Sequence, residues 1–107
     1  MERVVEGDLI TKHVGGKGVF STPAMIGLME MTSHRLLERA LPAGHTTVGY
    51  EVCVRHLAPA APGSTVVVTS KLTEVKGNKL YFDVACHQGD QLLGSGTHKR
   101  AIVPADF

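Results

Sequence analysis

The segment TPAMIGLME, from Thr22 to Glu30, opens with a hydroxyl and a proline and closes with the only charge in an otherwise apolar run. Thr22 suits the N-cap position of a helix, and Pro23 suits the first turn, where a missing N–H costs nothing. Proline and glycine at positions 42–44 are stop signals. At about 100° per residue, the residues between them form one apolar stripe: Met25, Ile26, Met29, Ser33, Leu36, Leu37 and Ala40. The pattern predicts one amphipathic helix over residues 23–41, with Glu30 on the flank of its buried stripe.

The chain on both sides of this helix has strand character. Before it, residues 4–14 mix apolar and β-branched side chains, and residues 15–18 read as a flexible glycine-rich loop. After it, four segments show alternating or β-branched patterns: 48–57, 65–75, 80–87 and 91–103. We therefore expect a single α+β domain over residues 1–107, with a five-stranded antiparallel sheet covered by one long helix. The last four strands are expected to form a meander.

Three details of the predicted strands carry expectations of their own. The apolar face of the first strand after the helix is expected to hold Val48, Tyr50, Val52, Val54 and His56. Gly94 and Gly96 mark a bend or a close approach of backbone in the last strand. Cys53 and Cys86 are too few and too far apart for a disulfide scaffold or a redox pair, so we expect two reduced thiols in the core.

Composition excludes several classes of function. The 107 residues carry a formal net charge of +1 with the charges interspersed, so no surface for nucleic acid is expected. No apolar run approaches the roughly 18 residues of a membrane-spanning helix, and the first residues lack an apolar leader segment. We expect a soluble, cytoplasmic protein.

The predicted sheet is only partly covered by the rest of the chain. A single helix covers one face of five strands, and the sheet keeps an unpaired edge. Pairing with a second copy would cover both. The pattern therefore predicts a homodimer.

Three side chains on separate elements could carry acyl-transfer chemistry: Thr22, Glu30 and His56. Each also has a purely structural interpretation, as a helix cap, a solvated flank residue and a hydrogen-bonded core histidine respectively. A desolvated Glu30 would be a candidate base or nucleophile, and His56 beside a turn could move a proton near neutral pH. The start of the helix also presents N–H groups that suit an oxygen gaining negative charge.

Metal and phosphate chemistry are not indicated. Residues 15–18 lack the spacing and the Lys-Ser/Thr ending of a phosphate-binding loop. The remaining histidines show neither the paired spacing nor the accompanying ligands of a zinc site: His13, His34, His45, His87 and His98. We expect no metal and no cofactor.

Several segments, in their order and spacing, resemble the fluoroacetyl-coenzyme A thioesterase-like family. They are residues 24–30 (AMIGLME), 47–49 (TVG), 54–58 (VRHLA), 62–66 (PGSTV) and 94–101 (GSGTHKRA). The resemblance implies the hotdog fold, in which an antiparallel sheet wraps around one long helix. It also implies a homodimer whose acyl-CoA sites lie at the subunit interface.

The resemblance further implies roles for individual residues. The family's catalytic threonine, glutamate and histidine fall on Thr22, Glu30 and His56. A glycine and an arginine that line the family's site fall on Gly49 and Arg100.

The chain departs from the family between the first strand and the helix. Members that select fluoroacetyl-CoA have a longer segment there, with aromatic residues forming a lid over the acyl group. This chain has only the short glycine-rich stretch that ends in Phe20. We therefore expect thioester hydrolysis without selection of the fluorinated substrate, in a pocket shaped by Phe20, Met25, Met29 and the partner subunit.

The predicted function is hydrolysis of an acyl-CoA thioester to free acid and CoA, with a short or medium acyl group as substrate. Glu30 would attack the thioester carbonyl or activate a water, and His56 would move protons. Thr22 would hydrogen-bond the carboxylate or the carbonyl oxygen, and Arg100 would hold substrate or orient Glu30. The alternative is a hotdog module that binds acyl-CoA without hydrolysing it. A purely structural dimer or an enoyl-thioester hydratase fits the residues less well.

Overall fold

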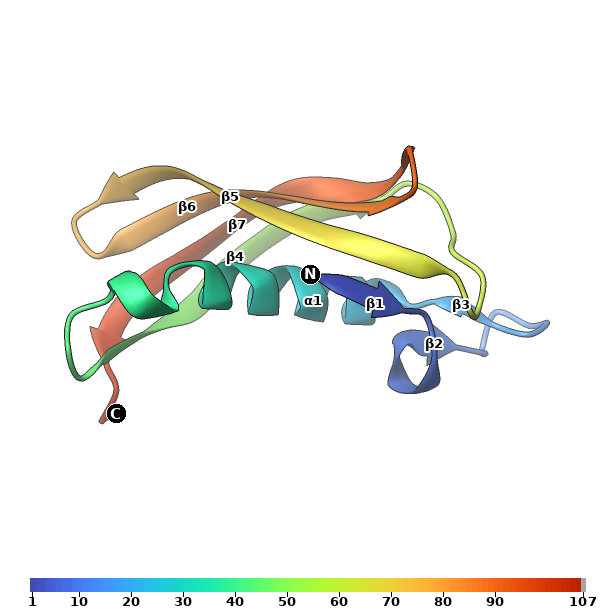
Figure 1. Ribbon diagram of the computed structural model, residues 1–107, viewed down its shortest axis with the longest axis horizontal. Helices are drawn as coiled ribbons and strands as arrows, with labels where there is room; N and C mark the ends of the chain where they lie inside the picture. The colour runs from blue at the N-terminus through green and yellow to red at the C-terminus, as the bar shows by residue number, and fades with distance from the viewer. Residues whose placement is uncertain (107) are drawn as a thin grey trace.

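A computed structural model describes residues 1–106 as one long helix lying along a curled five-stranded antiparallel sheet (Figure 1). The α+β class and the five strands are confirmed. The elements are β1 (Glu2–Val4), a 3-10 turn (Gly7–Leu9), β2 (Ile10–Thr11), β3 (Val19–Phe20), α1 (Thr22–Leu36), a second 3-10 turn (Glu38–Ala40), β4 (His45–His56), β5 (Thr65–Lys76), β6 (Lys79–Gln88) and β7 (Gln91–Pro104).

The order of the strands differs from the predicted four-stranded meander. The sheet runs β1-β5-β6-β7-β4, so only β5, β6 and β7 form a meander, and β4 pairs with β7 instead of β5. Tight turns at residues 77–78 and 89–90 force neighbouring strands together. The longer connection over residues 57–64 leaves β4 free to take the opposite edge of the sheet.

The prediction of one N-terminal strand over residues 4–14 is wrong. Only Glu2–Val4 joins the main sheet, where it pairs with β5. The chain then leaves the sheet at Gly7, whose φ of +54° suits glycine, and forms a separate hairpin from β2 and β3. The glycine-rich loop is the connection of this hairpin, which projects beyond the start of α1 (Figure 1).

Both ends of the helix differ from the predicted ones. Ser21, and not Thr22, is the N-cap, because its Oγ accepts the N–H of Ala24 at 3.1 Å. Thr22 is therefore the first helical residue and its hydroxyl is not needed for capping. The helix ends at Leu36, which is 49% exposed, and not at Leu41, because the chain tightens into a 3-10 turn there.

The core lies between the helix and the concave face of the sheet. The helix buries Met25, Leu28, Met29 and Ser33. The alternation predicted for β6 is confirmed, since its inward side chains are all buried: Leu80, Phe82, Val84 and Cys86.

The two cysteines occupy different environments. Cys86 is in the core as predicted, and burial raises the pKa of its thiol to about 11. Cys53 is exposed, so its prediction as a core thiol is wrong. Its side chain takes the opposite parity to Val52 and Val54, which are both partly buried.

Close backbone approach at the two glycines of β7 is confirmed. A Cβ at Gly94 would lie 2.6 Å from Sδ of Met25, so this glycine makes room for the helix. A Cβ at Gly96 would collide with the carbonyl oxygen of Cys53 on β4. The two glycines therefore allow β7 to fit tightly against α1 and β4.

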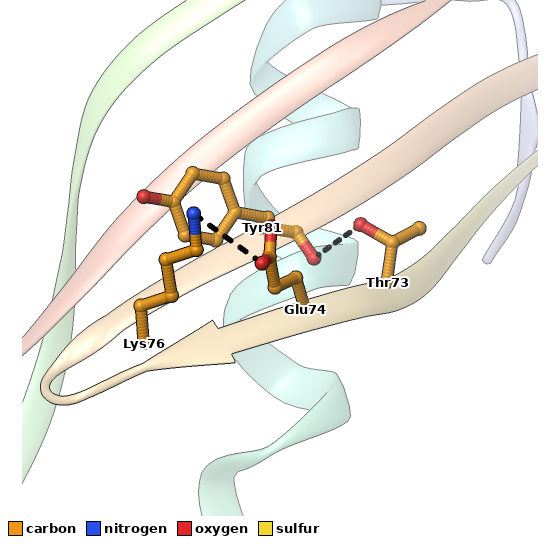
Figure 2. A network of polar contacts seen from close by, with 4 residues as sticks. All are labelled: Thr73, Glu74, Lys76 and Tyr81. Atoms are coloured by element: carbon orange, nitrogen blue, oxygen red, sulfur yellow. Dashed lines mark hydrogen bonds and ion pairs between the residues drawn. The ribbon is translucent and has the colours of Figure 1, made fainter.

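The hairpin that joins β5 to β6 lies at the opposite end of the sheet from β2 and β3 (Figure 1). The β5–β6 register shifts between Leu72 and Glu74, and the Thr73 hydroxyl donates to the Tyr81 carbonyl at 3.1 Å (Figure 2). Lys76 pairs with Glu74 at 3.4 Å (Figure 2). Both ends of this ion pair are exposed, so the contact orders the hairpin tip and adds little stability.

A register shift in β4 changes which of its side chains face the helix. The shift lies between Gly49 and Glu51, and Tyr50 is 48% exposed. The predicted face is therefore wrong at Val48 and Tyr50, because Thr47 and Gly49 face the helix before the shift. Before the shift Thr47 is buried, and after it Val52, Val54 and His56 are partly buried.

Candidate active site

Thr22 and His56 meet where the first turn of α1 reaches the end of β4. The Thr22 Oγ1 and His56 Nδ1 atoms are 2.8 Å apart, although the residues lie 34 positions apart in the sequence. Ser21 caps the helix, so the Thr22 hydroxyl is free for this contact. When that hydroxyl donates to Nδ1, the ring proton of a neutral His56 lies on Nε2.

The other side of the His56 ring lies in an apolar setting. Phe20, which is 1% exposed, packs edge-on against it with ring centroids 5.9 Å apart. The His56 Nε2 atom is buried and has no hydrogen-bond partner within residues 1–106. A buried nitrogen without a partner is costly, and an outside group reaches this atom only when the side chains that cover it shift.

A cavity of about 680 Å³ opens beside this pair. Phe20, Thr22 and His56 line it together with further residues of the β2–β3 hairpin and residues 57–59. Most of the lining is apolar, and no Lys or Arg of the described chain lines it. The cavity therefore suits an uncharged, largely apolar group next to a hydroxyl and an imidazole.

In the first turn of α1, three of the four residues offer no free N–H group. Pro23 has no N–H, the Ala24 N–H bonds the Ser21 hydroxyl, and the Met25 N–H bonds the Ser21 carbonyl. The polar side chain that this turn presents to the cavity is Thr22, with its hydroxyl.

Glu30 does not reach the Thr22–His56 pair within one chain. It lies eight residues further along α1 than Thr22, which corresponds to about 12 Å along the helix axis. Its carboxylate is on the half-buried flank of the helix and makes no ion pair within residues 1–106. Glu30 is neither solvated on an open face nor joined to His56, and its neighbours belong to a second cluster.

Gly49 and Arg100 belong to this second cluster. They are paired across β4 and β7. A Cβ at Gly49 would lie 3.4 Å from the Glu30 Oε1 and 3.2 Å from the Arg100 Nη1. The missing side chain therefore lets the carboxylate approach the guanidinium.

Arg100 is 7% exposed, and its N–H groups are directed to protein acceptors. Nε donates to the Thr47 hydroxyl at 2.9 Å and Nη2 to the Thr47 carbonyl at 2.8 Å. Nη1 donates to the His98 Nε2 at 3.2 Å, and Nη2 also approaches the His34 Nδ1 at 3.3 Å. Burial lowers the pKa of Arg100, and the charge of Glu30 raises it in partial compensation. Arg100 was predicted either to hold substrate or to orient Glu30. Its hydrogen bonds fit the second role, because they leave few N–H groups of the guanidinium for substrate.

Three members of this cluster were not identified from the sequence: His34, Thr47 and His98. His98 directs Nδ1 to the Glu51 carbonyl at 2.8 Å, so its Nε2 is free to accept from Arg100. Burial lowers the pKa of His98, which favours this neutral form. One available signal was spacing, because His34 is four residues beyond Glu30 on the helix and His98 is two residues before Arg100 on its strand.

Within a single chain these residues therefore form two separate groups. Thr22, His56 and Phe20 form the first group, beside the cavity. Glu30, Gly49 and Arg100 form the other. Both groups border β4, which is an edge strand of the sheet.

One long helix against a curled antiparallel sheet is the hotdog architecture. A hot-dog-like protein from Thermanaerovibrio acidaminovorans has the same fold with a TM-score of 0.91 at 25% identity, over 99% of this chain and 80% of that one. The family model described as fluoroacetyl-CoA-specific thioesterase matches residues 4–106, and the chain belongs to this family.

Two relatives show how far the similarity extends. A fluoroacetyl-CoA thioesterase of Streptantibioticus cattleyicolor is 42% identical over 85 residues, which cover 79% of this chain and 61% of that protein. The chain therefore aligns with about three fifths of that relative. A structure of the fluoroacetyl-CoA thioesterase FlK matches with a TM-score of 0.90 at 34% identity, over 99% of this chain and 84% of that one.

Proposed function

We propose that the protein hydrolyses acyl-CoA thioesters to free acid and CoA. The observation that carries the proposal is the hydrogen bond between Thr22 and His56 beside an apolar cavity. Family membership supports it, and a variant of the related FlK has been solved in complex with fluoroacetate and CoA. The unpaired cysteine thiols agree with a cytoplasmic location, which we also propose.

The proposed enzyme is a homodimer in which β4 pairs with its own copy. Antiparallel self-pairing places residues symmetrically about the two-fold axis. An axis between Val52 and Cys53 puts Gly49 of one subunit opposite the partner's His56. Glu30, which lies beside Gly49, then lies across the interface from the partner's His56. The Nε2 atom of that ring has no hydrogen-bond partner within residues 1–106, and a small shift of the side chains that cover it would let the carboxylate bond it.

In this shared site, Glu30 supplies the attacking oxygen by one of two routes. It either takes a proton from a water that attacks the thioester carbonyl, or attacks the carbonyl carbon itself to form an anhydride that water then hydrolyses. In both routes a C–O bond forms, the C–S bond breaks, and the CoA thiolate takes up a proton through His56. The Thr22 hydroxyl holds the imidazole in position and can turn to the carbonyl oxygen.

Arg100 acts through Glu30 and not on the substrate. Thr47 and His98 hold the guanidinium in place, and Gly49 leaves open the space between it and the carboxylate. Electrostatic attraction then keeps Glu30 at the position from which it reaches the partner subunit.

Replacing Thr22 with valine is expected to lower kcat about 100-fold, because the side chain keeps its shape and loses the hydroxyl bonded to His56. Stability should change little, since Ser21 is the cap. Ser21→Ala is the matched control, expected to lower the free energy of unfolding by about 1 kcal/mol. Steady-state kinetics and urea unfolding of both variants check this. Unchanged kcat in Thr22→Val would show that the hydroxyl has no part in the reaction.

The direct test of the function is release of free thiol from acyl-CoA by the purified protein. A thiol reagent follows the product with acetyl-, butyryl-, hexanoyl-, octanoyl- and decanoyl-CoA. Turnover of any member supports the proposal. Tight binding without thiol release across the series would instead support the acyl-CoA-binding module.

A further inference from the structure

The β2–β3 hairpin lines much of the cavity beside Thr22 and His56. Ile10 pairs with Phe20 and Thr11 with Val19, so each step along the hairpin leads away from the start of α1. Residues 57–59 form the facing wall. The cavity therefore extends from the reactive groups towards the hairpin tip, where Val14 lines it.

The length of this space can be estimated from the backbone. Val19 lies three residues before Thr22 along an extended chain, a distance of about 10 Å at about 3.3 Å per residue. An extended alkyl chain advances about 1.3 Å per carbon, given C–C bonds of about 1.5 Å. The wall from Thr22 to Val19 thus matches about eight carbons.

The chemistry of the lining selects the acyl tail over the rest of the substrate. No Lys or Arg within residues 1–106 lines the cavity, so the phosphates of CoA have no cation there. Thr11 and His13, the polar residues of the hairpin wall, bond each other, with 2.5 Å between Oγ1 and Nδ1. What remains along the walls is mainly aliphatic: Ile10, Val14, Val19, Leu57 and Ala58.

We propose that this cavity is the acyl subsite and takes straight-chain acyl groups of about six to ten carbons, with Val14 and Val19 setting the far end. The inference rests on the proposed thioesterase function and specifies its substrate class. Each methylene that enters the cavity should raise kcat/KM about fourfold. Acetyl-CoA, whose acyl group fills only the end next to Thr22, should be a poor substrate.

The test is kcat/KM for saturated acyl-CoAs from two to sixteen carbons, measured with the full chain. The expected profile rises from acetyl-CoA to a maximum between six and ten carbons and falls for longer chains. A maximum at acetyl-CoA would overturn the inference and leave the thioesterase function standing. No hydrolysis at any length would overturn both.

Val14→Trp tests the far end of the cavity. The larger side chain should lower the ratio of kcat/KM for octanoyl-CoA to that for acetyl-CoA by at least about tenfold. Val75→Trp is the matched control, since Val75 is similarly exposed, at 55% against 62% for Val14, and lies on the distant β5–β6 hairpin. An unchanged ratio in folded Val14→Trp would show that the hairpin does not bound the acyl group.

Discussion

Replacing Glu30 with glutamine is expected to lower kcat by about 10²- to 10⁴-fold, because the amide keeps the shape of the side chain but neither attacks a carbonyl nor takes a proton from water. The fold should remain intact, since Glu30 is only half-buried and makes no ion pair within residues 1–106. Thiol release from the best acyl-CoA measures the activity, and circular dichroism confirms folding.

The control for this substitution is Glu38→Gln, which removes the same charge from an exposed position in the 3-10 turn after the helix. It should retain the activity of the unmodified protein. Full activity in Glu30→Gln would contradict the proposed role of the carboxylate and leave the reaction to the Thr22–His56 pair.

Replacing Arg100 with leucine is expected to lower the free energy of unfolding by about 2–4 kcal/mol. The change leaves the Thr47 carbonyl and the His98 Nε2 buried without the guanidinium that bonds them. It should also lower kcat strongly, because Glu30 loses the positive charge beside it. Urea unfolding and steady-state kinetics measure the two effects separately.

Arg39→Leu is the matched control for this second prediction, because Arg39 is exposed at the end of the helical segment. Arg100→Lys should recover part of the lost activity, since it restores a charge near Glu30 without the planar set of donors. If Arg100→Leu kept both the stability and the kcat of the unmodified protein, Arg100 would not position Glu30.

The parts of the fold that follow from local patterns could be predicted from the sequence. The alternation in β6 gave the correct inward face, because each of its inward side chains meets the same core. Gly94 and Gly96 indicated a close approach of backbone for the same local reason. The position of β4 in the sheet could not be predicted from its alternation. Alternation indicates which face of a strand is buried, but it does not indicate which strand lies beside it.

The candidate site was predictable only in part. The register shift after Gly49 reverses which side chains of β4 face the helix. The alternation that correctly placed His56 on the inner face therefore placed Thr47 on the outer face, although Thr47 is buried. The N-cap was assigned one residue too late because Ser21 and Thr22 are both good caps, and only the three-dimensional structure shows which hydroxyl bonds the helix. The contacts of Arg100 could not be predicted, because its partners Thr47 and His34 come from another strand and a helix.

The separation of Glu30 from Thr22 could have been calculated from the predicted helix, whereas the contact of Thr22 with His56 could not. Eight helical residues separate Glu30 from Thr22, and it is the helix geometry that turns this spacing into a distance. The proposed reaction therefore requires a second subunit whose Glu30 reaches the Thr22–His56 pair of the first.

Subunit complementation between Glu30→Gln and His56→Ala tests this dependence most directly. Each variant dimer alone should be inactive, because both of its sites lack one essential group. After the two are unfolded together and refolded as a mixture, half of the dimers should be mixed, and each should contain one intact site made from the unmodified Glu30 of one chain and the unmodified His56 of the other. A site shared between subunits predicts recovery of about a quarter of the activity of the unmodified protein. A refolded mixture of dimers that stays inactive would contradict a site shared between subunits.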